Sequence, residues 1–295
     1  MTLPDFIVIG AMKCGTSSLH DQLALRSGLF LSTPKEPNYF SDDPVYARGE
    51  DWYRGLFAGV QPGQRCGESS THYTKLPTYP RTAVRMRALL EDVRLVYVMR
   101  HPIDRITSQY IHQWTENRVS SPLDEAVWED HRFLAYSSYA QQVEPFLEAY
   151  GPDRVLPVFF ERMIASPDAE LSRVCAFLSD PSPEPIRWQP DQVRNASAGR
   201  VRRSAWRDAV RNTPLGWIWR SVLRESWRAR IKSRWQLQER PELSAAVLTE
   251  VEAVLDADLA RLGDWLGMEL NCAGWRKQVT EKDPWWSVSA PAKQP

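Results

Sequence analysis

The stretch FIVIGAMKCGTSSL, residues 6–19, decides the fold of this chain. Its apolar start, residues 6–9, predicts a buried β-strand, and its hydroxyl-rich end predicts a helix that begins near Ser17. Two glycines, Gly10 and Gly15, bound the loop between them. Such a loop directs backbone N–H groups at an anion, and the helix N-terminus adds partial positive charge. The chain therefore opens with a predicted phosphate-binding loop.

The position of the lysine separates this loop from that of a nucleotide triphosphatase. A P-loop of that class reads G-x-x-x-x-G-K-[ST], with the lysine directly after the second glycine. Here Thr16 follows Gly15, and the lysine lies inside the loop at Lys13. In a P-loop, the Ser or Thr that directly follows the lysine holds Mg²⁺, and phosphoryl transfer normally uses that metal. With the lysine moved to Lys13, no residue of this loop is marked for that role. Transfer of a sulfuryl group, which carries less charge, can rely on the lysine and backbone donors alone.

A second anion-binding pattern lies in YVMRHPIDRITS, residues 97–108. An apolar strand ends at Arg100, and Ser108 follows on the next predicted helix. Ligands of doubly wound sheets bind beyond the carboxyl ends of the strands, so we expect these two side chains to converge on one anion. The arginine can hold that anion with two parallel hydrogen bonds. A P-loop kinase would end this strand with an acidic metal ligand instead.

The bulk composition bounds the class of protein. A chain of 295 residues that is 43% hydrophobic is long enough for one large domain. Its 37 Lys and Arg balance 37 Asp and Glu, which argues against a nucleic-acid partner. Four widely spaced cysteines indicate neither a zinc site nor a disulfide framework. We see no leader and no apolar run near the ~20 residues that span a bilayer, and so expect a cytoplasmic, bacterial enzyme without a transmembrane segment.

Strands and helices alternate along the first two thirds of the chain. Near-continuous apolar runs at residues 94–100 and 154–160 predict strands that a parallel sheet buries on both faces. Helical periodicity marks residues 17–27, 79–90, 103–114, 133–150, 167–178 and 244–265, the last expected to pack against the sheet. This order predicts a P-loop-type, three-layer α/β/α fold around a central parallel sheet. We expect one domain over residues 1–295, with a core at about 5–180 and a Trp- and Arg-rich C-terminal part at about 187–295.

The loop GAMKCGTSSL closely resembles the 5′-phosphosulfate loop of sulfotransferases that use 3′-phosphoadenosine 5′-phosphosulfate (PAPS), above all their bacterial and heparan-sulfate-type branch. The pattern from Arg100 to Ser108 is similar to the 3′-phosphate site of the same family. The resemblance extends over residues 6–178 and implies that no metal is required. The cofactor-binding residues that it implies are Lys13, Cys14, Gly15, Thr16, Ser17, Ser18, Arg100 and Ser108. We expect Cys14 to be a small filler residue rather than a reactive thiol.

The resemblance also implies a catalytic base in KEPNYF, residues 35–40. In the heparan-sulfate-type branch a glutamate stands at this point, ahead of paired aromatic residues, and Glu36 matches it. The chemistry needs such a group, because an acceptor hydroxyl is a poor nucleophile until its proton is removed. Lys13 is expected to act with Glu36 as a catalytic residue. Lys35, which directly precedes Glu36, is expected to bind the acceptor or the sulfate.

Two rival bases lie in GESSTHY, residues 67–73. His72 has the ordinary pKa for the role, and the cytosolic branch of the family uses a histidine, although in a K-T-H context that this chain lacks. Glu68 is the third candidate. The resemblance implies that Glu68 and Tyr73 line the acceptor cleft. We rank Glu36 first, His72 second and Glu68 third.

The segment RNASAGRVRR, residues 194–203, crowds small residues with arginines and suits closure over a phosphate. Ser197, Gly199 and Arg200 are the predicted cofactor contacts there. The tryptophans that follow are interleaved with arginines. Four roles are open to this segment: a helical lid, stacking on sugars, binding of an acidic substrate, or contact with a lipid-linked acceptor. We favour the lid. These tryptophans are Trp206, Trp217, Trp219, Trp227 and Trp235.

These features predict a sulfotransferase that moves the sulfuryl group of PAPS to a hydroxyl of a small-molecule or glycan acceptor and releases adenosine 3′,5′-bisphosphate. An amine acceptor has less support. The alternatives are a small-molecule P-loop kinase, which the place of Lys13 and the absence of an acidic residue after the 94–100 strand disfavour, and a nucleotide-binding protein without catalysis. The acceptor and the oligomeric state stay open.

Overall fold

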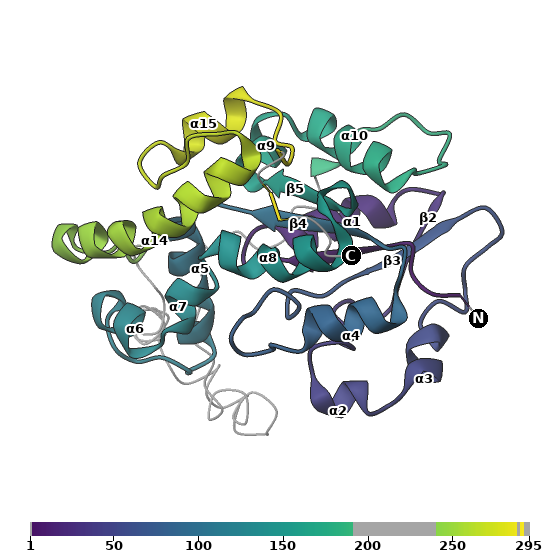
Figure 1. The fold of residues 1–295 in the computed structure, drawn as a ribbon, viewed down its shortest axis with the longest axis horizontal. Coiled ribbons are helices and arrows are strands. Elements are labelled where there is room, and N and C mark those ends of the chain that lie inside the picture. The colour runs from purple at the N-terminus through teal and green to yellow at the C-terminus, as the bar shows by residue number, and fades with distance from the viewer. Residues whose placement is uncertain (1, 191–239, 288–289, 292–295) are drawn as a thin grey trace, which may run out of the picture.

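The computed structural model describes residues 2–190, 240–287 and 290–291. At its centre lies a five-stranded sheet in which every neighbouring pair of strands is parallel, with the order β2-β3-β1-β4-β5 (Figure 1). The strands are β1 (Phe6–Gly10), β2 (Leu29–Leu31), β3 (Arg65–Ser69), β4 (Arg94–Met99) and β5 (Val155–Phe159). The parallel α/β arrangement predicted from the alternating pattern is confirmed.

Strands β1, β4 and β5 are apolar because helices cover both faces of the sheet. Every residue of β1 and β5 is buried, and in β4 only Arg94 at the strand end is not. Between β1 and β4 the register shifts after Val8, so that Gly10 pairs with Tyr97. This shift lies where the chain leaves the sheet and enters the predicted phosphate-binding loop.

Helices form the two outer layers (Figure 1). On one face α1 (Thr16–Ala24) contacts β1 and α10 (Pro167–Leu178), which also packs on β4 and β5. On the other face α4 (Thr82–Leu89) contacts α8 (Tyr139–Tyr150). The remaining elements are α2 (Asp43–Tyr46), α3 (Glu50–Gly55), α5 (Pro102–Thr115), α6 (Leu123–Glu129), α7 (Arg132–Ala135), a 3₁₀ turn at Pro152–Arg154, α9 (Phe160–Ala165), α14 (Ala245–Leu266) and α15 (Trp275–Glu281).

The helix predicted over residues 133–150 is wrong in one respect, because it is two helices, α7 and α8. The buried Arg105 guanidinium donates to the Phe133 carbonyl at 2.9 Å and to the Ser137 hydroxyl at 2.6 Å, which satisfies the end of α7. The start of α8 is satisfied from elsewhere in the chain. Asp258, on α14, accepts the backbone N–H groups of Ala140 and Gln141 at 2.8 and 3.0 Å.

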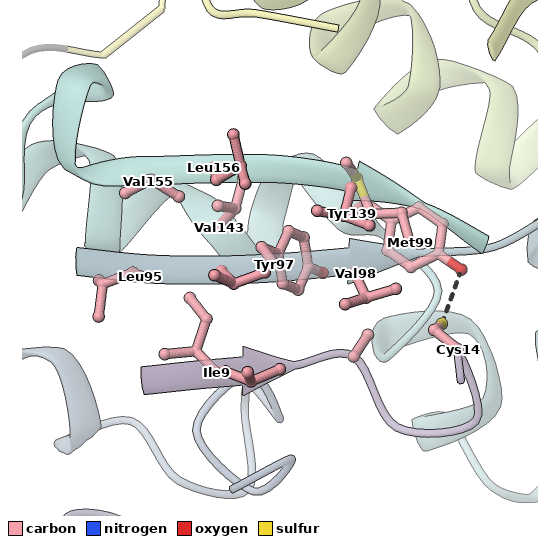
Figure 2. Packing of buried hydrophobic residues seen from close by; sticks show 14 of the residues in the cluster. Ile9, Cys14, Leu95, Tyr97, Val98, Met99, Tyr139, Val143, Val155 and Leu156 are labelled. Carbon is pink, nitrogen blue, oxygen red and sulfur yellow. Dashed lines mark hydrogen bonds between the residues drawn. The ribbon is translucent and has the colours of Figure 1, made fainter. Parts of the chain in front are cut away.

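The expectation that the 244–265 helix packs against the sheet is also wrong. This helix, α14, packs on α8 and α7, where Asp258 holds the α8 N-terminus. The C-terminal helix α15 instead brings Trp275 to the sheet, with its ring 5.2 Å from that of Phe159 and 5.8 Å from that of Tyr139. Buried residues of β1, β4, β5, α8, α14 and α15 belong to one continuous core, part of which is drawn in Figure 2. Among the described helices, none has the length and apolar character needed to cross a membrane.

Candidate active site

The phosphate-binding loop after β1 is pressed between two neighbouring side chains. Gly10 and Gly15 have φ angles of +152° and +87°, which disfavour other residues. A Cβ on Gly10 would lie 1.9 Å from Thr74 Oγ1, and one on Gly15 would lie 2.6 Å from the Phe160 ring. Both glycines of the motif are therefore required by backbone conformation and by contact.

Lys13, between those glycines, also has left-handed backbone, with φ of +70°. For a residue other than glycine this conformation costs on the order of 1–2 kcal/mol. Lys13 lines the same cleft as Thr16, Ser17 and Ser18 in the first turn of α1. The strained loop thus presents a lysine beside the N-terminus of a nine-residue helix, which favours an anion.

The Cys14 side chain points away from this cleft. Its Sγ lies 3.7 Å from the Tyr139 hydroxyl inside the core (Figure 2). Burial raises the pKa of the thiol to about 11, so it is neutral at physiological pH. The cofactor contact predicted for Cys14 therefore does not extend to its side chain, which is a packing group.

Arg100 and Ser108 reach the cleft from β4 and α5, as their spacing predicted. The Arg100 guanidinium lies 4.7 Å from the centre of the Phe160 ring and donates to the Lys13 carbonyl at 3.4 Å. Its Nε is buried and makes no hydrogen bond within the described part of the chain. A phosphate oxygen is an acceptor that suits a guanidinium donor of this kind.

Glu36 lies at the edge of the same cleft, on a loop where its φ is +59°. Its Oε1 accepts from Lys35 Nζ at 3.0 Å, and its Oε2 accepts from Thr71 Oγ1 at 3.0 Å. Burial opposes ionisation, but Lys35 and Thr71 outweigh it and lower the pKa of Glu36. Lys35 Nζ also donates to Ser17 Oγ at 3.1 Å. One lysine therefore joins the candidate base to the phosphate-binding loop.

His72 lines this cleft as well. Its Nδ1 is 2.9 Å from Asp42 Oδ2, and its ring stacks on Tyr79 with the centroids 4.9 Å apart. A carboxylate on Nδ1 fixes the ring and leaves Nε2 as the nitrogen available to a ligand. The two leading candidates for the base, Glu36 and His72, thus both reach the cleft.

Glu68 and Tyr73 do not reach it. Both are fully buried, and the Glu68 carboxylate accepts from Tyr53 and Tyr73 hydroxyls at 3.0 and 2.6 Å and from Ser70 Oγ at 2.6 Å. Burial raises the pKa of Glu68 to about 7. Ser70 Oγ in turn accepts the backbone N–H of Asn38 at 3.0 Å. The acceptor contacts predicted for Glu68 and Tyr73 are not found, and the pair instead braces the loop that carries Glu36.

The cleft continues beyond the phosphate-binding loop, with a volume of about 810 Å³. Its far part runs between the 71–79 segment and α5. The residues there include Lys75, Thr78, Tyr79, Gln109, His112, Gln113, Glu116, Arg118, Arg132 and Tyr136. Sequence reasoning missed Lys75, Gln109 and Phe160. Gln109 directly follows Ser108, but no motif marks the other two. The predicted contacts Ser197, Gly199 and Arg200 and the five tryptophans of 206–235 lie outside the described residues.

Comparisons with known proteins place the chain among sulfotransferases. The model of a family described as sulfotransferase domain matches residues 3–196. Heparan sulfate glucosamine 3-O-sulfotransferase 3B1 of Mus musculus is 30% identical over 186 residues, which are 60% of this chain and 46% of that protein. Membrane-associated sulfotransferase kil1 of Dictyostelium discoideum is 33% identical over 129 residues, or 42% of this chain and 26% of that protein. The chain thus spans less than half the length of these two relatives.

A solved structure agrees with this placement. The sulfotransferase from Alicyclobacillus acidocaldarius aligns with a TM-score of 0.56 at 29% identity, over 65% of this chain and 89% of that one. The aligned portion of the bacterial protein is nearly its whole length. Over the aligned part, the fold is therefore shared with a sulfotransferase.

Proposed function

Because the chain belongs to the sulfotransferase domain family, we propose that it transfers the sulfuryl group of PAPS to a hydroxyl of a glycan or small-molecule acceptor and releases adenosine 3′,5′-bisphosphate. The observation that carries the proposal is the chain of contacts from Ser17 through Lys35 to Glu36, which links an anion-binding loop to a carboxylate. The mouse relative's name specifies a sugar 3-O position, which supports a hydroxyl acceptor over an amine.

The donor would be held by groups on both sides of the loop. The loop amides, Lys13 and the α1 N-terminus would bind the 5′-phosphosulfate. Arg100 and Ser108 would bind the 3′-phosphate, and the unpartnered Arg100 Nε supplies a donor for it. When bound, PAPS supplies a sulfuryl group whose bond to the phosphate oxygen breaks as the acceptor oxygen bonds to sulfur.

The residues around that bond have separate tasks in the proposed reaction. Glu36 removes the proton of the acceptor hydroxyl as that oxygen attacks, since its carboxylate is ionised and faces the cleft. Lys13 stabilises negative charge on the sulfuryl oxygens and on the departing phosphate oxygen, and Lys35 holds Glu36 against Ser17. Phe160, under Gly15 and Arg100, keeps the two anion-binding elements together.

The kinase and the non-catalytic alternatives have less support. The position of Lys13 leaves no P-loop hydroxyl for Mg²⁺, and β4 runs into Arg100 rather than an acidic residue. A protein that only binds nucleotide would have no use for a carboxylate held toward the phosphate-binding loop. The cytoplasmic location and the lipid-linked acceptor stay predictions from the sequence.

Incubation with ³⁵S-labelled PAPS and a panel of hydroxylated acceptors tests the proposal directly. We expect a labelled product and adenosine 3′,5′-bisphosphate, with turnover unchanged by excess EDTA. No transfer from PAPS, together with Mg²⁺-dependent phosphorylation of an acceptor by ATP, would favour the kinase.

Nucleotide binding provides a second test, through Arg100. Arg100→Ala should weaken binding of adenosine 3′,5′-bisphosphate by about 1.5–3 kcal/mol, because a charge-assisted hydrogen bond is lost. Adenosine 5′-monophosphate, which lacks the 3′-phosphate, serves as the matched ligand. If the substitution weakens both nucleotides equally, the assignment of Arg100 to the 3′-phosphate is wrong.

A further inference from the structure

Two arginines from the C-terminal part of the chain lie beside the proposed 3′-phosphate site. Arg240 Nη2 donates to Asp104 Oδ1, and Arg276 Nη2 donates to Asp104 Oδ2, each at 2.5 Å. Asp104 precedes Ser108 by about one turn of α5, so the two side chains lie on the same face of that helix. Ser108 lines the cleft. The two guanidinium groups are therefore attached one helical turn from a residue to which we assign the 3′-phosphate.

The segment that carries Arg276 is also fixed to the nucleotide site from another side. α15 packs on α9, whose first residue, Phe160, lies with its ring centre 4.7 Å from the Arg100 guanidinium. Directly after Arg100, His101 Nε2 lies 3.0 Å from the Cys272 carbonyl oxygen. Burial lowers the pKa of His101, so this ring is neutral at pH 7. The arginines thus border the anion-binding cleft on elements that are packed against it.

The carboxylate of Asp104 does not cancel the positive charge around it. Burial would raise its pKa, but the charges of Arg100, Arg240 and Arg276 outweigh burial and lower it, so the group is ionised at neutral pH. A second acidic group, Glu161, accepts the backbone N–H of the residue after Arg100 at 2.8 Å. Among the described groups at this place, three guanidiniums thus meet two carboxylates, which leaves positive charge in excess.

Both outer arginines remain open to solvent although each is paired. The side chains of Arg240 and Arg276 are 46% and 65% exposed. Ion pairs this exposed contribute little to stability in water. Their charge, by contrast, acts over about one Debye length, which is about 8 Å at 0.15 M salt and about 30 Å at 0.01 M. The position and exposure of these two arginines therefore suit attraction of an anion rather than stabilisation of the fold.

We propose that Arg240 and Arg276 form a cationic rim of the nucleotide site, which attracts the 3′-phosphate nucleotide through long-range charge. They act in this way, rather than through a hydrogen bond to the nucleotide, because each guanidinium already donates to Asp104. Adenosine 3′,5′-bisphosphate carries about three to four negative charges at pH 7, so it gains strongly from such a field. This inference rests on the proposed function, since it concerns how the same nucleotide reaches its site.

Calorimetric titration with adenosine 3′,5′-bisphosphate at two salt concentrations tests the inference. In the double variant Arg240→Gln, Arg276→Gln we expect the affinity to fall about 10- to 50-fold at 0.01 M salt but less than about 5-fold at 0.15 M. The difference arises because salt screens charges that do not touch the ligand. Adenosine 5′-monophosphate, which has one phosphate less, should lose less affinity at low salt.

Arg154→Gln is the matched control for the loss of a positive charge. Arg154 lies in the turn before β5, at the opposite end of the strands from the cleft. Its side chain is 40% exposed and paired with Asp92, so it resembles the rim arginines in exposure and pairing. We expect this substitution to change the affinity by less than about 2-fold at either salt concentration.

Asp104→Asn separates attraction from a structural role by the sign of its effect. The substitution breaks both ion pairs, but it also removes a negative charge beside the nucleotide site. We therefore expect the affinity for adenosine 3′,5′-bisphosphate at 0.01 M salt to rise by about 2- to 5-fold. If the ion pairs served only to fix the C-terminal segment beside Arg100, the affinity would fall instead.

Any of four outcomes would overturn the inference. These are no loss of affinity in the double variant at 0.01 M salt, an equal loss at both salt concentrations, an equal loss in Arg154→Gln, and weaker low-salt binding in Asp104→Asn. Near-normal affinity of the double variant at 0.15 M salt shows that its fold and nucleotide site are intact. Failure of the wild type to bind adenosine 3′,5′-bisphosphate at either salt concentration would instead contradict the proposed function.

Discussion

Glu36 and Lys13, the residues to which we assign the chemistry, both have left-handed backbone conformations. The surrounding contacts stabilise this conformation: the Glu36 N–H donates to the Ser69 carbonyl at 3.0 Å, and the loop of Lys13 lies between Thr74 and Phe160. Strain of this kind persists only where neighbours determine it, and it is concentrated at functional sites. The two side chains are therefore directed at the cleft by the backbone itself.

Replacing the carboxylate of Glu36 tests its role as the base. Glu36→Gln keeps the shape of the side chain, and we expect turnover to fall by about 10²–10⁴-fold, the usual contribution of a positioned base. Binding of adenosine 3′,5′-bisphosphate, measured by titration, should barely change. His72→Ala is the parallel variant. If it is inactive while Glu36→Gln keeps near-normal turnover, the base is His72.

Lys35 controls the pH range over which Glu36 is ionised. Its charge and hydrogen bond, with the Thr71 hydroxyl, outweigh burial and hold the pKa of Glu36 below the ordinary 4.5, so the midpoint of the acid limb of wild-type kcat should lie below that pH. In Lys35→Met burial is opposed mainly by Thr71, and the acid limb should move to higher pH. The measurement is kcat against pH, normalised to each plateau. Coincident limbs would show that Lys35 does not act on this carboxylate.

At this scale the sequence predicted residues that belong to local patterns and missed those that long-range packing brings in. Lys13, Arg100 and Ser108 follow strand ends or glycines, and they do line the cleft. The prediction that Glu68 contacts the acceptor is wrong, because a glutamate in a strand suggests a functional site although this one is buried in the core. Its three hydroxyl partners come partly from α3, and no sequence pattern shows that contact.

Among the elements, β3, α3 and the loop after β2 meet at the Glu68 carboxylate. Tyr53 of α3 donates to this group and stacks on Tyr39 of the loop, with ring centroids 4.5 Å apart. Ser70 connects the same carboxylate to the Asn38 backbone. The position of the loop that bears Glu36 thus depends on a group at the centre of the core.

This carboxylate should make stability depend on pH. Its pKa is raised from 4.5 to about 7, so the folded state binds the proton more tightly than the unfolded state. The resulting stability is present below pH 4.5 and is lost as the pH rises through 7, a change on the order of 3 kcal/mol. Glu68→Gln should remove this loss. Urea unfolding of both proteins at pH 5 and pH 7.5 measures it, and parallel pH dependences would contradict the assignment.

Element types were predicted better than element ends. The strands and the long helices lie where periodicity placed them, because burial on one or both faces leaves a local pattern. The break between α7 and α8 depends on the contact of Arg105 with Phe133, which lies 28 residues away in the chain. The position of α14 on α8 depends on the contact of Asp258 with Ala140, which lies 118 residues away. Short-range patterns contain no information about such contacts.

For the molecule as a whole, the C-terminal elements complete the core although the family model ends at residue 196. Asp104, at the start of α5, is bound by Arg240 and Arg276. His101 Nε2 lies 3.0 Å from the Cys272 carbonyl. Both contacts adjoin Arg100, so α15 and the chain before it are attached to the proposed nucleotide site.

Trp275 provides the test at this scale. It is fully buried against Phe159 and Tyr139, and Trp275→Ala should cost about 3–5 kcal/mol of unfolding free energy through lost burial and a cavity. Trp285→Ala is the control, because that side chain is 45% exposed and should cost less than about 1 kcal/mol. Denaturant unfolding measures both. Equal losses would mean that the C-terminal helix is not part of the core.

Tyr139 stands between the two anion-binding elements. Its hydroxyl donates to the Arg100 carbonyl at 2.6 Å, accepts from the Arg100 N–H at 3.3 Å and lies 3.7 Å from Cys14 Sγ (Figure 2). The loop after β1 and the end of β4 are thereby joined through one rigid ring before any ligand arrives. Little binding free energy is then lost in ordering either element. The nucleotide half of the cleft is therefore held together by contacts within the protein, and ligand recognition there is a matter of fit rather than of folding.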